Sequence, residues 1–192
     1  SSGIYLTVLL RPAISPADAP LVTLLAGLAA REAIAEQTGL DCDVRWPNDL
    51  LLGGKKVSGI LTEMHAEPDQ VKFVIVGIGI NVNHAKFPEE LESIATSLRL
   101  ATGKQHSRLE LLVKLLRALE RHYNQFLAEG SRPVVEEFAQ VSSYARGKRV
   151  RISTANETYV GTTAGLEANG LLRVEREDGR TAVVISGDVS EA

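Results

Sequence analysis

The sequence contains a single cysteine, Cys42, which excludes an internal disulfide framework. A lone thiol suits a reducing compartment, so we expect a cytoplasmic protein. No apolar stretch approaches the roughly 18 residues that a membrane-spanning helix needs, and the chain does not open on a signal-peptide pattern. No histidine-cysteine signature surrounds Cys42, so we interpret it as a buried or half-exposed thiol and not as a nucleophile.

Several motifs of nucleotide and metal chemistry are also missing. There is no Gly-x-x-x-x-Gly-Lys phosphate loop and no Gly-x-Ser-x-Gly elbow, and Gly77-Ile78-Gly79 is only half of a dinucleotide fingerprint. The histidines lack the spacing of metal ligands; they are His65, His84, His106 and His122. The net charge is −3 and the isoelectric point about 5.8, so DNA binding is not supported. A nucleotide would have to bind on the surface of a sheet.

The pattern of apolar residues and breakers predicts an α+β fold. Apolar residues make up 44% of 192 residues, enough for one domain and a small second one. Ser15-Pro16 predicts the start of a helix that runs to about Thr38, and Ser107 to Glu110 form a capping box that opens a long helix closed by Gly130. The remaining elements are a shorter helix at 133–139 and strands at 4–10, 43–46, 50–52, 55–65 and 71–82. We expect the helices to pack on a mixed or antiparallel sheet.

The character of the chain changes around residues 142–147. Short strands then alternate with turn signals at Asn169-Gly170 and Asp178-Gly179, which predicts a small all-β module that curls like a barrel to bury its core. The predicted domains are 1–143 and 144–192. At the other end, Ser1-Ser2-Gly3 leads directly into an apolar strand with no initiator methionine, so we expect the chain to begin inside a domain.

The most informative segment is Arg45-Trp46-Pro47-Asn48-Asp49-Leu50, followed by a glycine turn and Lys55-Lys56-Val57-Ser58-Gly59. Lysine is rarely buried without a partner, and a lysine fixed beside glycines commonly holds a carboxylate or a phosphate. Asn48 and Asp49 follow a stiff Trp-Pro corner, where both can form local turns. Alternatively, Asp49 helps to hold Mg²⁺ together with phosphate oxygens. Both interpretations stay open at this point.

Strand alternation assigns these residues to faces. Gly77, Gly79 and Asn81 share one face of the strand 71–82, and the bare backbone there suits a closely approaching ligand. Regular alternation in the hairpin strand puts Lys56, Ser58, Ile60 and Thr62 on one side and Gly59 on the other. Lys55 and Lys56 then point to opposite faces, and spacing alone does not say which one faces a ligand.

Three segments in this order resemble the biotin protein ligases: Arg45 to Leu50, Lys55-Lys-Val-Ser-Gly-Ile-Leu61 and Gly77-Ile-Gly-Ile-Asn-Val82. The start at Gly3 to Thr7 and the end at Ser186 to Ser190 also fit, so the resemblance covers essentially the whole chain. It implies a catalytic domain like those of class II aminoacyl-tRNA synthetases and lipoate ligases, followed by an SH3-like barrel.

The resemblance also implies a two-step reaction. Biotin and ATP, with Mg²⁺, form biotinyl-5′-AMP, and the biotin then passes to a lysine of a biotin carboxyl carrier domain. By the family pattern, Lys56 contacts the biotin carboxyl group and the α-phosphate, and Gly59 completes its motif. Asn48 and Asp49 correspond to the nucleotide and metal side, with Asp49 a possible Mg²⁺ ligand, and Trp46 is expected among the residues that bind substrate or cofactor. Gly77, Gly79 and Asn81 lie under the ligand.

One feature of the family is missing. Its glycine- and arginine-rich loop belongs before the first strand of this sequence, so the 192 residues alone are expected not to catalyse the full reaction. The alternatives are a lipoate-attaching ligase and a non-catalytic binding module. The basic edge at residues 146–151 either faces the nucleotide or protects an edge strand by its charge. A homodimer paired through a sheet edge stays open.

Overall fold

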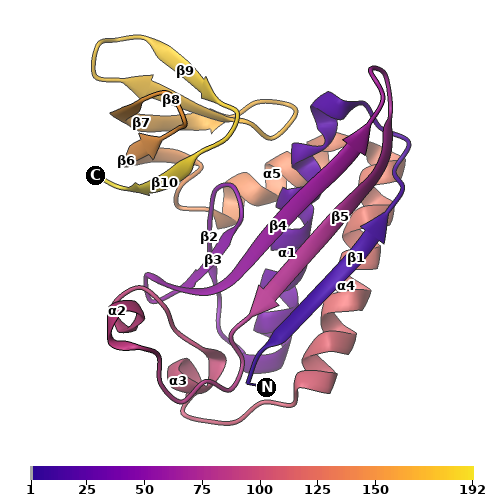
Figure 1. The fold of residues 1–192 in the computed structure, drawn as a ribbon, viewed down its shortest axis with the longest axis vertical. Coiled ribbons are helices and arrows are strands. Elements are labelled where there is room, and N and C mark those ends of the chain that lie inside the picture. Colours follow the sequence, from indigo (N-terminus) through magenta and orange to yellow (C-terminus); the bar gives the residue numbers. More distant parts are fainter. Residues whose placement is uncertain (1) are drawn as a thin grey trace.

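A computed structural model of the protein describes residues 2–192 and contains two five-stranded antiparallel sheets (Figure 1). The first sheet has the strand order β1-β5-β4-β3-β2, and helices α1 and α4 lie behind it. The second sheet forms the C-terminal module, at the opposite end of the molecule from the short helices α2 and α3. The predicted α+β class is confirmed.

The strands of the first sheet lie close to their predicted positions. They are β1 (Ile4–Leu10), β2 (Asp43–Arg45), β3 (Asp49–Leu52), β4 (Lys55–Ala66) and β5 (Val71–Ile80). Gly53 and Gly54 turn the hairpin between β3 and β4 with positive φ angles of 58° and 78°, which glycine adopts without steric cost. Because β4 is much longer than β3, only its first half has neighbours on both edges.

One face of this sheet is covered by helix α1, and the helices α4 and α5 pack against α1. These three helices are α1 (Pro20–Thr38), α4 (Arg108–Glu129) and α5 (Ser131–Val141). Helix α1 is apolar nearly all round and carries the centre of the core, in which Leu21, Leu25 and Ile34 are fully buried. It faces Ile60 and Thr62 of β4, and Thr62 shares a hydrogen bond of 2.6 Å with Thr23. The opposite face of the sheet carries exposed side chains.

The predicted helix start at Ser15 is wrong in detail. Ser15 precedes a short 3₁₀ turn, η1 (Pro16–Asp18), and its hydroxyl donates to the Asp18 carboxylate instead of capping a backbone N–H. Helix α1 itself begins at Pro20. The second capping prediction is confirmed, because the Ser107 hydroxyl accepts from the Glu110 N–H at the start of α4.

Two short helices were not predicted. They are α2 (Glu89–Glu92) and α3 (Leu98–Thr102), and the Ser97 hydroxyl caps α3 by accepting from the Leu100 N–H. The segment between them runs along the start of β4: the Lys56 N–H donates to Ile94 O, and the Thr96 N–H donates to Lys56 O. This segment therefore closes the edge of β4 beside Lys56.

The C-terminal module contains β6 (Arg146–Ser153), β7 (Thr158–Leu166), β8 (Leu172–Arg176), β9 (Thr181–Val184) and β10 (Asp188–Glu191), in the order β10-β6-β7-β8-β9. Its small core includes Val150, Ile152, Leu172 and Val174. Helix α5 ends at Val141 and β6 begins at Arg146; the predicted boundary between residues 143 and 144 stays a prediction.

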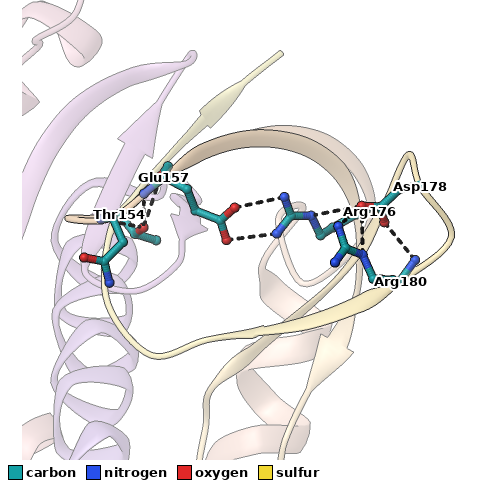
Figure 2. Close-up of polar contacts among 6 residues, drawn as sticks. Thr154, Glu157, Arg176, Asp178 and Arg180 are labelled. Carbon is teal, nitrogen blue, oxygen red and sulfur yellow. Dashed lines mark hydrogen bonds and ion pairs between the residues drawn. The ribbon is translucent and has the colours of Figure 1, made fainter.

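Exposed ion pairs join the hairpin ends of the module (Figure 2). Glu157 accepts two hydrogen bonds of 2.9 Å from Arg176, whose guanidinium lies 4.0 Å from the ring centre of Tyr159. Arg180 pairs with Asp178 at the next turn. These hydrogen bonds lower the pKa of Glu157, and those from Arg180 lower the pKa of Asp178 to about 2.

No helix within residues 2–192 is long and apolar enough to cross a membrane. Ser1, which belongs to the predicted start inside a domain, lies outside the described residues.

Candidate functional site

Three charged side chains meet at the hairpin end of the first sheet. The carboxylate of Asp49 is nearly buried, and Arg45 donates to its Oδ2 at 2.5 Å. The ammonium group of Lys56 pairs with the other carboxylate oxygen, Oδ1. The Lys56 side chain is 45% exposed, whereas that of Asp49 is 11% exposed. Asp49 therefore holds the Lys56 ammonium group from the protein side, and the other side of this group is open to solvent or a ligand.

The predicted face of Lys56 is wrong, because β4 contains a bulge. Leu50 pairs with Ser58, but the next residue of β3, Leu51, pairs with Lys56, so Val57 is the extra residue. A bulge shifts the alternation by one position. Lys56 consequently leaves the helix-covered side of Ser58 and lies on the side of Gly59.

The absence of a side chain at Gly59 leaves space for the Lys56 side chain. A Cβ atom placed on Gly59 would lie 2.9 Å from Cε and 3.1 Å from Nζ of Lys56. Gly59 pairs with Gly79, and Gly79 pairs in turn with Tyr5 of β1. Gly77 is next on the same face, opposite Leu61. We call this surface, formed by Gly59, Gly77 and Gly79, the glycine face.

The glycine face is accessible. Tyr5 is 75% exposed and Leu61 is 65% exposed, and both border the glycines. A Cβ on Gly79 would lie 3.9 Å from the Tyr5 ring, which is ordinary contact, so the surface beside Tyr5 is flat. Bare backbone next to a cation is a surface that an anionic ligand can approach closely.

Lys55 is held differently. Its ammonium group donates to Glu92 O, the last carbonyl of α2, at 2.6 Å. Lys55 thus fastens the short helix, whereas Lys56 faces the glycines. Of the two lysines, the structure places Lys56 on the candidate site.

The other predicted site residues have contacts within the protein. The Asn48 side-chain amide donates to Ile60 O at 2.8 Å, and the Ile60 N–H donates to Asn48 O, so Asn48 extends the pairing of β3 with β4. Asn81 follows β5, and its backbone pairs with Val57 and Leu98. Ligand contacts of Asn48 and Asn81 stay predictions.

Trp46 is 3% exposed, and its indole N–H donates to Gly170 O of the C-terminal module at 2.9 Å. The peptide bond between Trp46 and Pro47 is cis. This hydrogen bond ties the only polar atom of the Trp46 side chain to the module, and a contact of Trp46 with substrate or cofactor stays a prediction.

A groove of about 1000 Å³ separates the C-terminal module from the first sheet. Its walls include Trp46, Asn48, Leu61 and Met64 on one side and Thr154 and Ile185 on the other. Lys56 and the glycines of the glycine face are not among its lining residues, so this groove lies beside the charged site and not on it. Along the groove, residues 61–66 of β4 pair with β5 on one edge and with no strand of residues 2–192 on the other.

The residues fit a resident metal ion poorly. Within the described part of the chain, no group of three or more His, Cys, Asp or Glu side chains is close enough to hold one. Both oxygens of Asp49 already face protein cations. A Mg²⁺ ion would therefore have to arrive on the phosphates of a nucleotide, and a contact of Asp49 with it stays a prediction.

One residue at the site, Arg45, is missing from the residues predicted from the sequence. Arg45 was noticed only as part of a motif, although an arginine four residues before an aspartate in a tight hairpin is a signal of an ion pair. His84, like the other histidines predicted to be non-catalytic, has a structural contact: its ring stacks on Phe87 at 5.3 Å. By contrast, Cys42 is 2% exposed, and burial raises its pKa to about 12, as fits an unreactive thiol.

Comparison with known proteins gives matches at both ends of the chain. The Biotin/lipoate A/B protein ligase family matches residues 1–81, and the Biotin protein ligase C terminal domain matches residues 146–190.

Individual relatives match over nearly all of the chain. The bifunctional ligase/repressor BirA of Bacillus subtilis is 40% identical over 182 residues, which are 93% of this chain and 55% of that protein. The biotin–[acetyl-CoA-carboxylase] ligase of Paracoccus denitrificans is 31% identical over 187 residues, 92% of this chain and 75% of that protein. The structure of the Aquifex aeolicus biotin protein ligase in complex with biotin and ATP superposes with a TM-score of 0.83 at 30% identity, covering 99% of this chain and 78% of that one. The chain spans about half the length of the Bacillus relative.

Proposed function

The chain belongs to the biotin protein ligase family, and we propose that it forms the core of an ATP-dependent ligase that activates biotin as biotinyl-5′-AMP. The activated biotin then passes to a lysine of a biotin carboxyl carrier domain. The cytoplasm is the proposed location, because the reaction consumes ATP and the protein has a free, buried cysteine.

The observation that carries this proposal is the position of Lys56 on the glycine face, held by Asp49. Adenylate formation brings the biotin carboxylate to the α-phosphate of ATP, and both groups are anions. Two unit charges 4 Å apart repel by about 4 kcal/mol at an effective dielectric of about 20. A fixed ammonium group offsets this repulsion, and does so more strongly as charge develops in the transition state. Lys56 is therefore proposed as the charge stabiliser and not as a nucleophile.

Gly59, Gly77 and Gly79 are proposed to form the floor on which the two substrates meet. Without side chains, the backbone of β4 and β5 can lie against the ligand. The Aquifex relative was solved with biotin and ATP, and its fold superposes on nearly the whole of this chain. Mg²⁺ is proposed to enter with ATP, bound mainly by the phosphates.

The carrier domain is proposed to approach along the groove beside the C-terminal module. Within residues 2–192, no strand pairs with the edge of β4 at residues 61–66 that faces away from β5, and an extended segment can add there as a further strand. The exposed apolar side chains of Leu61, Met64 and Ile185 border the same groove. This approach leads toward Gly59 and Lys56 along β4.

A lipoate ligase is the second candidate, because the matching catalytic family includes ligases for both acids. The match of residues 146–190 to the C-terminal domain of biotin protein ligases favours biotin. Calorimetric titration of the full-length protein with each acid in the presence of ATP separates the two, and a preference for lipoate would reverse the assignment. Absence of binding to both acids would favour a non-catalytic module.

The catalytic assignment is tested with Lys56→Ala and its neighbour Lys55→Ala in the full-length protein. Without the Lys56 ammonium group, the repulsion of about 4 kcal/mol between the two anions is no longer offset. Biotin-dependent exchange of pyrophosphate into ATP should therefore slow about 10³-fold. Lys55→Ala changes only a surface contact with Glu92 and should have little effect. Equal effects of the two substitutions, or an active Lys56→Ala variant, would contradict the assignment.

A further inference from the structure

Strand β2 has little support within its own sheet. It is an edge strand of three residues, and among the strands of residues 2–192 it pairs with β3 alone. So short an edge strand is marginal unless something covers it. Yet its last residue, Arg45, supplies one of the two cations that hold Asp49. The position of Arg45 therefore depends on contacts outside the sheet.

Those contacts come from the linker that leads into the C-terminal module. The Ser142 hydroxyl donates to Val44 O. The Ser143 N–H and hydroxyl both donate to the carboxylate of Asp43, at 2.8 Å and 2.6 Å. The two residues of β2 before Arg45 are thus fastened by residues about 100 positions later in the chain.

The residue after Arg45 is fastened by the module itself. The buried indole of Trp46 donates to Gly170 O, and Gly170 lies in the turn before β8 with a φ of 82°. This turn fits tightly against α1: a Cβ on Gly170 would lie 2.7 Å from Cδ1 of Leu24 and 3.2 Å from Cδ2 of Leu21. The Gly170 carbonyl can meet the indole only while the turn is seated on the helix.

A continuous set of contacts then leads from the module to the catalytic lysine. Gly170 holds Trp46, and Trp46 adjoins Arg45, which pairs with Asp49 both in the strand register and through its guanidinium. Asp49 in turn pairs with the ammonium group of Lys56. Gly170, Trp46 and Asp49 are buried and Arg45 is half-buried, so a displacement of the module is transmitted through packed neighbours to the carboxylate that holds the more exposed Lys56.

We infer that the C-terminal module positions the Lys56 ammonium group, with Trp46 as the positioning residue and Gly170 as its partner. The role of Lys56 in this statement rests on the proposed function. The module is then part of the catalytic apparatus even though the ammonium group of Lys56 pairs with Asp49 and not with a residue of the module. A misplaced cation leaves substrate binding largely intact but stabilises the transition state less, so the effect belongs in kcat.

The first test compares matched variants of the full-length protein. Trp46→Phe keeps an aromatic ring but removes the donor to Gly170. Gly170→Ala forces the turn off α1, whereas Gly179→Ala introduces an alanine at the same φ of 82° in an exposed turn with nothing within 4 Å. We expect Trp46→Phe and Gly170→Ala to lower kcat of pyrophosphate exchange about tenfold or more with little change in the KM for biotin, and Gly179→Ala to resemble the wild type.

Thermal unfolding of each variant shows that the comparison is made on folded protein. If Trp46→Phe does not fold, Gly170→Ala carries the test. Equal losses of kcat in Gly170→Ala and Gly179→Ala would overturn the inference, because backbone strain alone would then explain them. A rise in KM at unchanged kcat would also overturn it.

A double-mutant cycle tests the route through Asp49. In an Asp49→Asn background the carboxylate that holds Lys56 is already lost, so adding Trp46→Phe should reduce kcat little further. Fully additive losses would mean that Trp46 acts by another path, and would contradict the inference.

A readout that needs no activity separates this inference from the proposed function. Amine labelling followed by mass spectrometry reports how readily each lysine reacts. Trp46→Phe and Gly170→Ala should raise labelling of Lys56 relative to the exposed Lys104, and Gly179→Ala should not. If the wild type shows no biotin-dependent exchange of pyrophosphate, the proposed function fails. If labelling of Lys56 is unchanged in Trp46→Phe and Gly170→Ala, positioning of Lys56 by the module is refuted.

Discussion

Gly59→Ala tests whether Lys56 acts from the glycine face. A Cβ on Gly59 lies 2.9 Å from Cε and 3.1 Å from Nζ of Lys56, and 3.5 Å from Oδ1 of Asp49. Carbon atoms in ordinary contact are about 3.5–4.0 Å apart, so the lysine side chain has to move by roughly 0.6–1.1 Å. Because the Lys56 side chain is 45% exposed, it can move outward into solvent without disturbing the core.

This displacement predicts a large kinetic effect and a small effect on stability. A misplacement of about 1 Å at a reacting centre costs about 10²-fold in rate, which corresponds to about 2.7 kcal/mol of transition-state stabilisation. The free energy of unfolding should change by less than about 1 kcal/mol, because a half-exposed ion pair contributes little to stability. Loss of activity and loss of stability are thereby separated.

The assay is biotin-dependent exchange of pyrophosphate into ATP, with kcat and the KM for biotin measured separately. Gly77→Ala is the matched control on the same face. Its Cβ would meet Leu61 at 3.6–3.9 Å, in ordinary contact, and does not approach Lys56. Gly77→Ala narrows the proposed floor and should raise KM, whereas Gly59→Ala should mainly lower kcat.

Two results would refute this reasoning. The first is a Gly59→Ala variant with the kcat of the wild type, which would show that Lys56 does not need the space above Gly59. The second is a full further loss of rate when Gly59→Ala is added to Lys56→Ala, because the glycine would then act independently of the lysine.

Three further predictions concern stability and reactivity. The Cys42 thiol, whose pKa burial raises to about 12, should resist iodoacetamide in the native protein and react after unfolding in guanidinium; fast native labelling would contradict its burial. Leu25→Ala removes a fully buried side chain of α1 and should lower the free energy of unfolding by about 2–5 kcal/mol in a denaturant titration, and a near-neutral change would place the core elsewhere. Arg180 lowers the pKa of Asp178 from 3.8 to about 2, so this pair stabilises the module above pH 3.8 and the contribution disappears as the pH falls toward 2; thermal unfolding of Asp178→Asn should show a weaker dependence on pH over that window.

Much of the first sheet could be predicted because its signals are local. Strand patterns and the Gly53-Gly54 turn predicted the β3–β4 hairpin within one or two residues of its observed bounds. The short helices α2 and α3 could not be predicted, because four or five residues are too few to show a helical period of apolar residues. The contact between Trp46 and Gly170 joins residues 124 positions apart, and no local pattern reports such a pair.

The spacing of Lys56 and Gly59 nevertheless indicates the bulge that the prediction of regular alternation omits. Residues three apart in a regular strand face opposite sides of the sheet, so a lysine and a glycine that serve one ligand at this spacing contradict regular alternation. A bulge of one residue removes the contradiction, and Val57 is that residue. Its side chain is fully buried, which anchors the bulge in the core. A Lys-x-x-Gly motif within a strand that binds a ligand on one face is therefore itself a prediction of a bulge.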